Sequence, residues 1–324
     1  KHILAGKPAQ SVKLAYAFCE KDEAVMGENA KRLFFVYNPH SGRGNIRSKL
    51  FDIVQVFSEA GYEITIYPTR EAKDATRKIE HLSDQYDLVV CSGGDGTLDE
   101  VVEGMMHRQK KLPLGYIPSG TVNDFARSLK IPRDMVKAAR LAVSGKDFLS
   151  DVGTFNNSHF VYIAAFGIFT DVAYSTPQDM KNVLGNMAYL LEGVKRLANI
   201  PSYHLKFSSE ECSGEGDFIF GMVTNSRSVG GFKSIIGKNV RFDDGVFEVT
   251  FVRLPKNAAE LQEILAAIVL KEMDTHYMIS FRTARLTIEA QQEIPWTLDG
   301  EYGGESQNVI IQNHQKALQI RTGN

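Results

Sequence analysis

Three loops rich in glycine and small polar residues have the composition of an anion-binding site. They read NPHSGRG (Asn38 to Gly44), SGGDGT (Ser92 to Thr97) and PSGTVND (Pro118 to Asp124). Glycine lets main-chain N–H groups approach an anion closely, hydroxyl groups add donors, and a following helix contributes partial positive charge. Any one loop is equally well explained as a simple turn. Three of them at successive strand ends favour a polyphosphate site.

Acidic residues within these loops point to a metal ion beside the phosphates. Asp95 would repel a bare polyphosphate, so we expect it to hold the magnesium that accompanies ATP. The alternative is that Asp95 caps the following helix. Asp99 and Glu100 suit the dipole in the first turn of that helix, so their acidity requires no special function. Asp124 is either a second acid of the site or a helix-start residue.

A phosphoryl acceptor also needs a base, and the best candidates lie far along the chain in WTLDGEYGG, where Asp299 and Glu301 flank a glycine. If this segment is extended, residues two apart share one face and the two carboxylates converge. One can then take the proton of the acceptor hydroxyl while the other orients it. An ordinary Asp-Gly hairpin turn is the alternative, and the local pattern alone favours that turn.

Two further groups of residues have side chains that can bind metal ions: the aspartates of FDDGVFEV and the histidines. In FDDGVFEV, Asp243 and Asp244 precede a glycine and a strand, which suits either an oxygen-ligand cation site or a solvated turn, and the pattern alone favours the turn. The eight histidines include no pair at metal-ligand spacing, so we assign them no role.

The elements that must position these residues alternate regularly from Arg32 to about Ser150. Strands are predicted at RLFFVY, YEITIY, DLVVC and LGYIP, and helical periodicity follows each of them. This alternation predicts a parallel sheet covered by helices on both faces. Because ligands bind at the carboxyl ends of such strands, the three loops are expected to share one rim of the sheet.

Past about Ser150 the pattern becomes strand-rich. Two strand-like runs surround an Asn-Asn turn in DVGTFNNSHFVYIAAF, and helices are predicted only near Met180–Asn199 and Ala258–Lys271. We therefore expect mostly antiparallel strands in a sandwich or barrel-like arrangement. The predicted division is an accessory segment 1–31, an α/β domain 32–150 completed by a returning segment 308–324, and a β-rich domain 151–307.

Composition excludes several classes of protein. The chain has 324 residues, of which 43% are hydrophobic and 23% charged, as in soluble globular proteins of about two domains. A net charge of −2 gives no basic surplus, so no nucleic-acid partner is expected. Cys19, Cys91 and Cys212 lack metal spacing and suggest reduced thiols in a cytosolic protein. The longest apolar stretch, Phe160 to Phe169, is half of the ~20 residues that a spanning helix needs, and no signal peptide opens the chain.

The sequence lacks the motifs of several common enzyme classes. The sequence contains no GxxxxGK[ST] phosphate loop and no GxSxG hydrolase elbow. Its nearest approach to the dinucleotide motif GxGxxG has Arg47 in place of the last glycine. P-loop enzymes, the commonest hydrolases and dinucleotide-binding dehydrogenases are therefore disfavoured.

The string GGDGTLDEVVEGM, preceded by an NPxSG loop and followed by PSGTVNDFARSL, resembles the soluble bacterial diacylglycerol kinase family. That family belongs to a wider group of lipid kinases that includes sphingosine and ceramide kinases. The resemblance runs from about Arg32 to the carboxyl terminus, and residues 1–31 fit no family element. GGDGT alone also occurs in NAD kinases and phosphofructokinases, whereas its combination with GTxNDFAR and a late DGE is highly specific.

The resemblance implies an ATP- and Mg²⁺-dependent two-domain enzyme that phosphorylates a lipid hydroxyl. Its fold would be an N-terminal parallel-sheet nucleotide-binding domain of the phosphofructokinase and NAD kinase type, followed by a mostly antiparallel β-sandwich domain for the lipid. The positions that match nucleotide contacts are Asn38, Pro39, His40, Ser41, Gly42, Thr69, Gly93, Gly94, Asp95, Gly96, Thr97, Leu98, Asp99 and Thr121.

The same resemblance assigns the acids of the site. Asp299 and Glu301 match the catalytic acids, which outweighs the hairpin-turn reading, and we expect Glu301 to be the base. Asp124 falls in the same site. A structural magnesium maps onto Asp244 with main-chain oxygens of Arg241 and Val246.

Diacylglycerol, giving phosphatidic acid, is the first choice of substrate by resemblance. Two other functions stay open on the residues: an NAD kinase, disfavoured by GTVNDFAR at the downstream position, and a lipid-binding module without transfer activity. For the kinase we expect a cytoplasmic enzyme that contacts the inner face of the membrane transiently, and the resemblance suggests a homodimer.

Overall fold

The computed structural model describes residues 30–44, 46–168, 170, 201–225, 240–270 and 276–323. The predicted helix at 180–199, Cys19 and nearly all of the predicted accessory segment lie outside these residues. Among the helices that are described, none is long and apolar enough to span a membrane.

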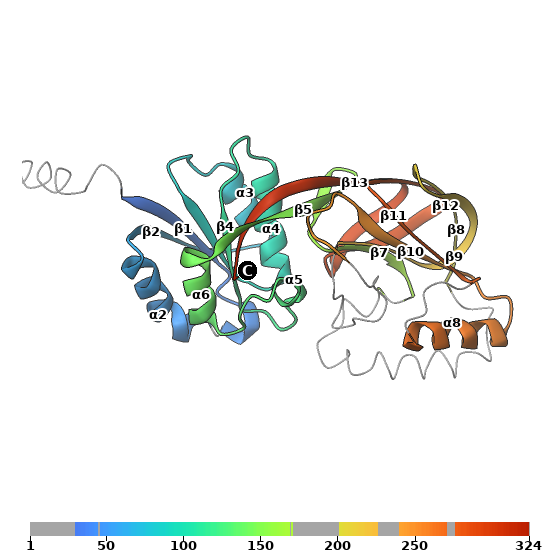
Figure 1. Cartoon of the computed structure of the whole chain (residues 1–324), viewed down its shortest axis with the longest axis horizontal. Coiled ribbons are helices and arrows are strands. Elements are labelled where there is room, and N and C mark those ends of the chain that lie inside the picture. The colour runs from blue at the N-terminus through green and yellow to red at the C-terminus, as the bar shows by residue number, and fades with distance from the viewer. Residues whose placement is uncertain are drawn as a thin grey trace, which may run out of the picture.

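The first half of the chain alternates strands and helices, as its hydrophobic pattern predicts. Its elements are β1 (Lys31–Tyr37), η1 (Ser41–Gly44), α2 (Ile46–Glu59), β2 (Tyr62–Pro68), α3 (Asp74–Glu80), β3 (Leu88–Gly93), α4 (Asp95–Met106), β4 (Leu114–Pro118), α5 (Asp124–Ser128) and α6 (Met135–Ser144). The strands pair in parallel in the order β4-β3-β1-β2. Every residue of β3 and β4 is buried, which explains their continuous apolar runs. Figure 1 shows the helices packed around this sheet.

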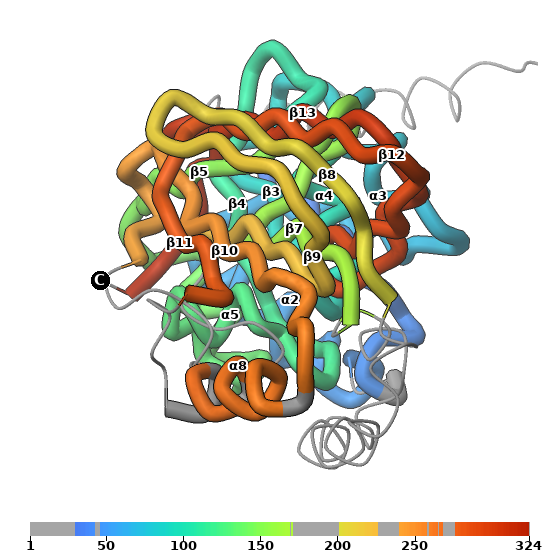
Figure 2. The backbone as a smooth tube through the Cα atoms, turned by 90° about the vertical axis from the view of Figure 1, so that its right-hand side faces the viewer, coloured from blue at the N-terminus to red at the C-terminus, as the bar shows by residue number. Residues whose placement is uncertain are grey.

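The second half is built mainly of antiparallel strands. Its elements are β5 (Lys146–Phe155), β6 (Ser158–Phe160), β7 (Ile163–Gly167), β8 (Tyr203–Ser208), β9 (Ser213–Thr224), β10 (Phe247–Arg253), α8 (Ala258–Leu270), β11 (Met278–Thr283), β12 (Arg285–Leu298) and β13 (Glu301–Thr322). A core of its own forms around stacked rings, with the centroids of Phe207 and Phe251 4.7 Å apart. Helix α8 lies to one side of these strands (Figure 2).

Strand β13 connects the two halves. It pairs antiparallel with β12 at its beginning and with β5 further along, and near its end Ile320 pairs in parallel with Leu114 of β4. The return of the carboxyl-terminal segment toward the first sheet thus appears in the strand register. Figure 1 shows β13 and β5 running side by side between the two groups of elements. The described strands consequently form one 13-stranded sheet.

Candidate active site

The three glycine-rich loops meet at the carboxyl ends of β1, β3 and β4. The main-chain N–H of Asn38 donates to the Ser92 carbonyl at 2.9 Å, and its Nδ2 atom donates to Thr97 Oγ1 at 3.3 Å. The N–H of Ser119 donates to the Gly93 carbonyl at 2.8 Å. Parallel pairing brings these ends to one edge because β3 lies between the other two strands. The three loops therefore form a single site.

Close approach of the main chains in this site requires glycine. Gly42 has φ +55°, and a Cβ atom there would lie 1.8 Å from the Ser119 carbonyl oxygen. A Cβ atom on Gly120 would lie 2.5 Å from Gly94 Cα. A side chain at either position would force the loops apart.

Asn123 fixes the third loop. It has φ +53°, its Nδ2 atom donates to the Gly120 carbonyl at 2.7 Å, and its Oδ1 atom accepts the N–H of Gly120 at 3.1 Å. The hydroxyl of Tyr116 donates toward the same Oδ1 atom at 3.3 Å. Asp124 follows as the first residue of α5, and its N–H donates to Asp95 Oδ2 at 3.3 Å.

Four aspartates from distant parts of the chain form an acidic cluster beneath the loops: Asp124 and Asp299 are buried, and Asp95 and Asp99 are partly buried. Burial, followed by the charge of Asp124, raises the pKa of Asp95 to about 7. Burial and the charge of Asp299 raise the pKa of Asp99 well above its ordinary range. Burial raises the pKa of Asp299 to about 6, although it accepts a hydrogen bond from the Asp99 carboxyl and others from the main chain. Such perturbed acids concentrate at functional sites.

Asp299 lies in the turn between β12 and β13, so the extended geometry considered for LDGEY is not formed. Asp299 and Gly300 both have positive φ, +50° and +88°, as the central residues of a hairpin turn do. The Asp299 carboxylate nevertheless reaches the site. It accepts the N–H groups of Val161 at 2.5 Å, Tyr162 at 2.8 Å and Ile163 at 2.9 Å, and only 3% of the residue is exposed.

Glu301, by contrast, is an exposed residue at the start of β13. A Cβ atom placed on Gly96 would lie 3.2 Å from Glu301 Oε1, so the glutamate borders the second loop directly. The turn therefore carries one fixed, buried carboxylate and one accessible carboxylate at the same edge of the site.

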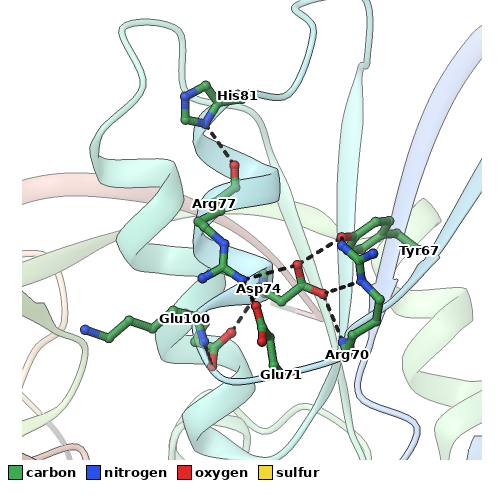
Figure 3. A network of polar contacts seen from close by, with 9 residues as sticks. Tyr67, Arg70, Glu71, Asp74, Arg77, His81 and Glu100 are labelled. Carbon is green, nitrogen blue, oxygen red and sulfur yellow. Dashed lines mark hydrogen bonds and ion pairs between the residues drawn. The ribbon is translucent and has the colours of Figure 1, made fainter.

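A polar network orders the segment that contains Thr69, whose N–H donates to the Tyr37 carbonyl at 2.9 Å. Buried Asp74 accepts the Tyr67 hydroxyl at 3.0 Å and the N–H of Arg70 at 2.9 Å (Figure 3). Glu100 accepts N–H groups at the start of α3, from Lys73 at 2.8 Å and Ala75 at 3.2 Å. Glu100 therefore joins α4 to α3, whereas Asp99 faces the acidic cluster.

The other residues that were predicted to contact the nucleotide differ in their solvent exposure and in their hydrogen bonds. The side chain of Leu98 is apolar and fully buried in the core, so this side chain does not reach the nucleotide. The N–H of His40 donates to Asn38 Oδ1 at 2.9 Å and tightens the turn that contains Pro39 and Ser41. Thr121 is exposed at the rim of the third loop.

The acidic cluster fits a magnesium ion. Asp95 Oδ1 and Asp99 Oδ1 are buried and have no hydrogen-bond donor. Leaving buried carboxylate oxygens unpaired is unfavourable, and a hard divalent cation takes oxygen ligands of this kind.

The second predicted metal position, at Asp244, also offers carboxylate oxygens. Asp244 Oδ2 pairs with Arg282, and Oδ1 accepts the N–H of Val246 at 3.4 Å. Nearby Glu248 Oε2 is buried without a donor, and burial raises the Glu248 pKa to about 7. Arg241 pairs with Asp243 at 3.3 Å through its side chain. The excess of acid here is compatible with an added cation.

Sequence and structure comparisons agree on the family. The profile of the diacylglycerol kinase catalytic domain matches residues 32–155. Diacylglycerol kinases of Staphylococcus aureus, from the bovine RF122 / ET3-1 and MRSA252 strains, are 33% identical over 277 residues, covering 85% of this chain and 87% of theirs. A Bacillus anthracis str. Sterne structure, assigned provisionally as a diacylglycerol kinase, superposes with a TM-score of 0.73 at 25% identity and covers 90% of this chain and 98% of that one.

Taken with the glycine-rich site, these matches define the class as the lipid kinase phosphotransferases. The prediction from the GGDGT, GTVNDFAR and DGE motifs, that the chain resembles diacylglycerol kinases, is therefore confirmed. The chain belongs to the diacylglycerol kinase family.

Proposed function

We propose that this protein transfers the γ-phosphoryl group of Mg-ATP to a lipid hydroxyl, with diacylglycerol as substrate and phosphatidic acid as product. The main support is the meeting of three glycine-rich loops with a cluster of four aspartates, one of which comes from a distant part of the chain. Membership of the diacylglycerol kinase family supports the same reaction.

The loops would bind the nucleotide through their main-chain N–H groups, with Thr69 and Thr121 at the rim. We propose that residues 32–150, completed by 308–324, form a nucleotide domain of the phosphofructokinase and NAD kinase type. Residues 151–307 would form the β-sandwich domain that binds the lipid. Catalysis of phosphoryl transfer then rests on positioning and charge neutralisation more than on covalent chemistry.

Glu301 is the proposed general base. Its carboxylate would take the proton of the lipid hydroxyl as the hydroxyl oxygen forms a bond to the γ-phosphorus of ATP. The bond between the γ-phosphorus and the oxygen that bridges the β- and γ-phosphates breaks, and ADP is released. The exposure of Glu301 beside Gly96 supports this role. Asp299 already accepts three N–H groups, so it is the better candidate for holding the turn and shaping the field around Glu301.

Asp95, Asp99 and Asp124 would hold the nucleotide's magnesium, directly or through water. When bound, the ion neutralises the phosphate charge that develops in transfer. Asp244, with main-chain oxygens of Arg241 and Val246, would hold a second, structural magnesium. The unpaired carboxylate oxygens of Asp95, Asp99 and Glu248 support both assignments.

In the cell we place the enzyme in the cytoplasm, in transient contact with the inner face of the membrane and as a homodimer. Two large exposed side chains would suit that contact: Phe51 on α2, 79% exposed, and Tyr302 beside the proposed base, 58% exposed. No nucleic-acid partner is proposed.

The test is ATP-to-diacylglycerol transfer in mixed micelles with Glu301→Gln. We expect turnover to fall about 10²- to 10⁴-fold, with nucleotide affinity unchanged, because only the proton acceptor is removed. Glu305→Gln, an exposed glutamate four residues along β13, is the matched control and should retain full activity.

Three outcomes would contradict the proposal. Near-normal turnover in Glu301→Gln would show that Glu301 is not the general base. Abundant NADP from ATP and NAD would indicate an NAD kinase. Absence of ADP release with every lipid alcohol tried would indicate a lipid-binding module.

A further inference from the structure

A second cluster of polar side chains lies at the far end of α4 from the acidic site. It comprises Glu103 on α4, His107 one turn later at the carboxyl-terminal cap of that helix, and His159 on β6. Glu103 Oε1 lies 3.1 Å from His107 Nε2, and Glu103 Oε2 lies 2.8 Å from His159 Nδ1. Within the described part of the chain, these three residues place one ligand atom each within 4.8 Å of one another.

We propose that Glu103, His107 and His159 bind a Zn²⁺ ion. Four-coordinate zinc has bonds of about 2.0–2.2 Å, which sets neighbouring ligand atoms roughly 3.4 Å apart. The two carboxylate-to-imidazole distances, 3.1 Å from Oε1 and 2.8 Å from Oε2, join different oxygens of Glu103, so the side chains must rotate to place one oxygen and both nitrogens around the ion. Two imidazole nitrogens among three ligands favour zinc over magnesium, which prefers oxygen.

The surroundings of His107 support this assignment. If Nε2 binds the ion, the ring proton resides on Nδ1. Nδ1 lies 3.8 Å from Glu80 Oε2 of α3, so a rotation of one of these side chains is needed before they hydrogen-bond. A carboxylate that accepts the second N–H of a metal-bound imidazole orients the ring and increases its basicity. The His107 side chain is 38% exposed, which leaves room for water in the fourth position, whereas that of His159 is 13% exposed and better fixed.

Such an ion would join elements from the two halves of the chain. It lies about 12 Å along α4 from Asp95, by the rise of 1.5 Å per residue. On its other side, β6 leads directly to the N–H groups of Val161, Tyr162 and Ile163, which bind Asp299. Zinc would therefore fix α4 against the segment that holds the buried turn of the acidic site.

The experiment is a Zn²⁺ titration of the full-length protein in buffer with excess Mg²⁺, which occupies oxygen-ligand sites. Calorimetry should give one Zn²⁺ per chain, and Zn²⁺ should raise the melting temperature. In His107→Gln and His159→Gln the affinity should fall at least about tenfold, the usual range for loss of a metal-site group. Because His107 is partly exposed, its variant is expected to fold even if that of His159 does not.

His204→Gln is the matched control. His204 also contacts two carboxylates, Asp217 at 2.9 Å and Glu215 at 3.3 Å, but it forms no three-residue cluster with a second imidazole among the residues that the structure describes. Its removal should leave zinc binding unchanged. Co²⁺ should give the intense visible absorption of a four-coordinate site in the wild type and lose it in His107→Gln. Absence of Zn²⁺ binding to the wild type, or equal binding in His107→Gln, would overturn the proposal.

Discussion

At the scale of single residues, Asp299 is distinguished by its bonding. Its carboxylate accepts three main-chain N–H groups, and an amide in its place has only one accepting oxygen. We therefore expect Asp299→Asn to lower the free energy of unfolding by about 1–3 kcal/mol, the penalty for an unsatisfied buried donor. Urea unfolding followed by the fluorescence of Trp296, the single tryptophan, would measure it.

Asp99→Asn is the contrasting variant. Burial and the charge of Asp299 raise the pKa of Asp99 well above its ordinary range, and the Asp99 carboxyl donates to Asp299. An amide matches a neutral carboxyl in size and can still donate to Asp299. Its unfolding free energy should change by less than about 1 kcal/mol. An equal loss in both variants would contradict the hydrogen bonding described here.

The residue types of this site could be read from the sequence, but their partners could not. DGE marked Asp299 and Glu301, and the glycine loops marked Asp95. From its position alone Asp99 looked like a helix-dipole residue, because its partner, Asp299, is remote in sequence. The family resemblance placed Asp99 among the nucleotide contacts. The histidine cluster was missed because its spacing is Glu-to-His on one helix, and the second histidine comes from a separate strand.

At the scale of elements, the glycine loops act through the separation of their main chains. Gly42→Ala would place Cβ 1.8 Å from the Ser119 carbonyl in a left-handed conformation. The loops must then separate, and we expect kcat/KM for ATP to fall by about 10²-fold, as misplacement by roughly 1 Å does. Steady-state kinetics with varied ATP would measure this.

Gly61→Ala provides the control for strain alone. Gly61 also has positive φ, +81°, but no atom lies within 4 Å of its Cβ position. This variant should lose about 1–2 kcal/mol of stability and keep its nucleotide kinetics. If both variants had the same kinetics, contact between the first and third loops would be unimportant for the nucleotide.

Element prediction succeeded where burial imposes a strong pattern. The four parallel strands and the turn at Asn156 between β5 and β6 were all expected, because buried runs and turn residues are local signals. Helix α6 was not predicted, although its sequence carries helix signals: Ala138, Ala139 and Ala142 form one buried face, and Asp134 caps the first turn by accepting the N–H of Lys137. The Asp-Gly pattern of the DGE segment favoured the hairpin turn that the structure has, but the placement of Asp299 against Val161 to Ile163 depends on contacts that no local pattern contains.

At the scale of the whole molecule, the acidic cluster makes stability depend on pH and magnesium. In the folded protein the pKa of Asp95 is about 7 and that of Asp299 about 6, against 3.8 ordinarily. Between about pH 4 and 7 the folded state therefore binds more protons than the unfolded state, and these groups lower stability as pH rises.

Magnesium should offset this repulsion most where the acids are ionised. The rise in melting temperature on adding Mg²⁺ should be larger at pH 8 than at pH 6, measured by calorimetry at constant ionic strength. In Asp95→Asn the difference between the two pH values should shrink, which separates this cluster from Asp244 and Glu248. Equal stabilisation at both pH values in the wild type would argue against a cation bound by these acids.

The path of β13 also bears on how the protein is made. Glu301 stands at its start, while Ile320, near its end, supplies the pairing with β4. During synthesis on the ribosome, Glu301 and the strand that pairs with β4 therefore emerge after β1 to β12 have all been made. A chain truncated before Glu301 would expose the edge of β4 and lack the proposed base, so such a product could neither phosphorylate lipid nor close its sheet.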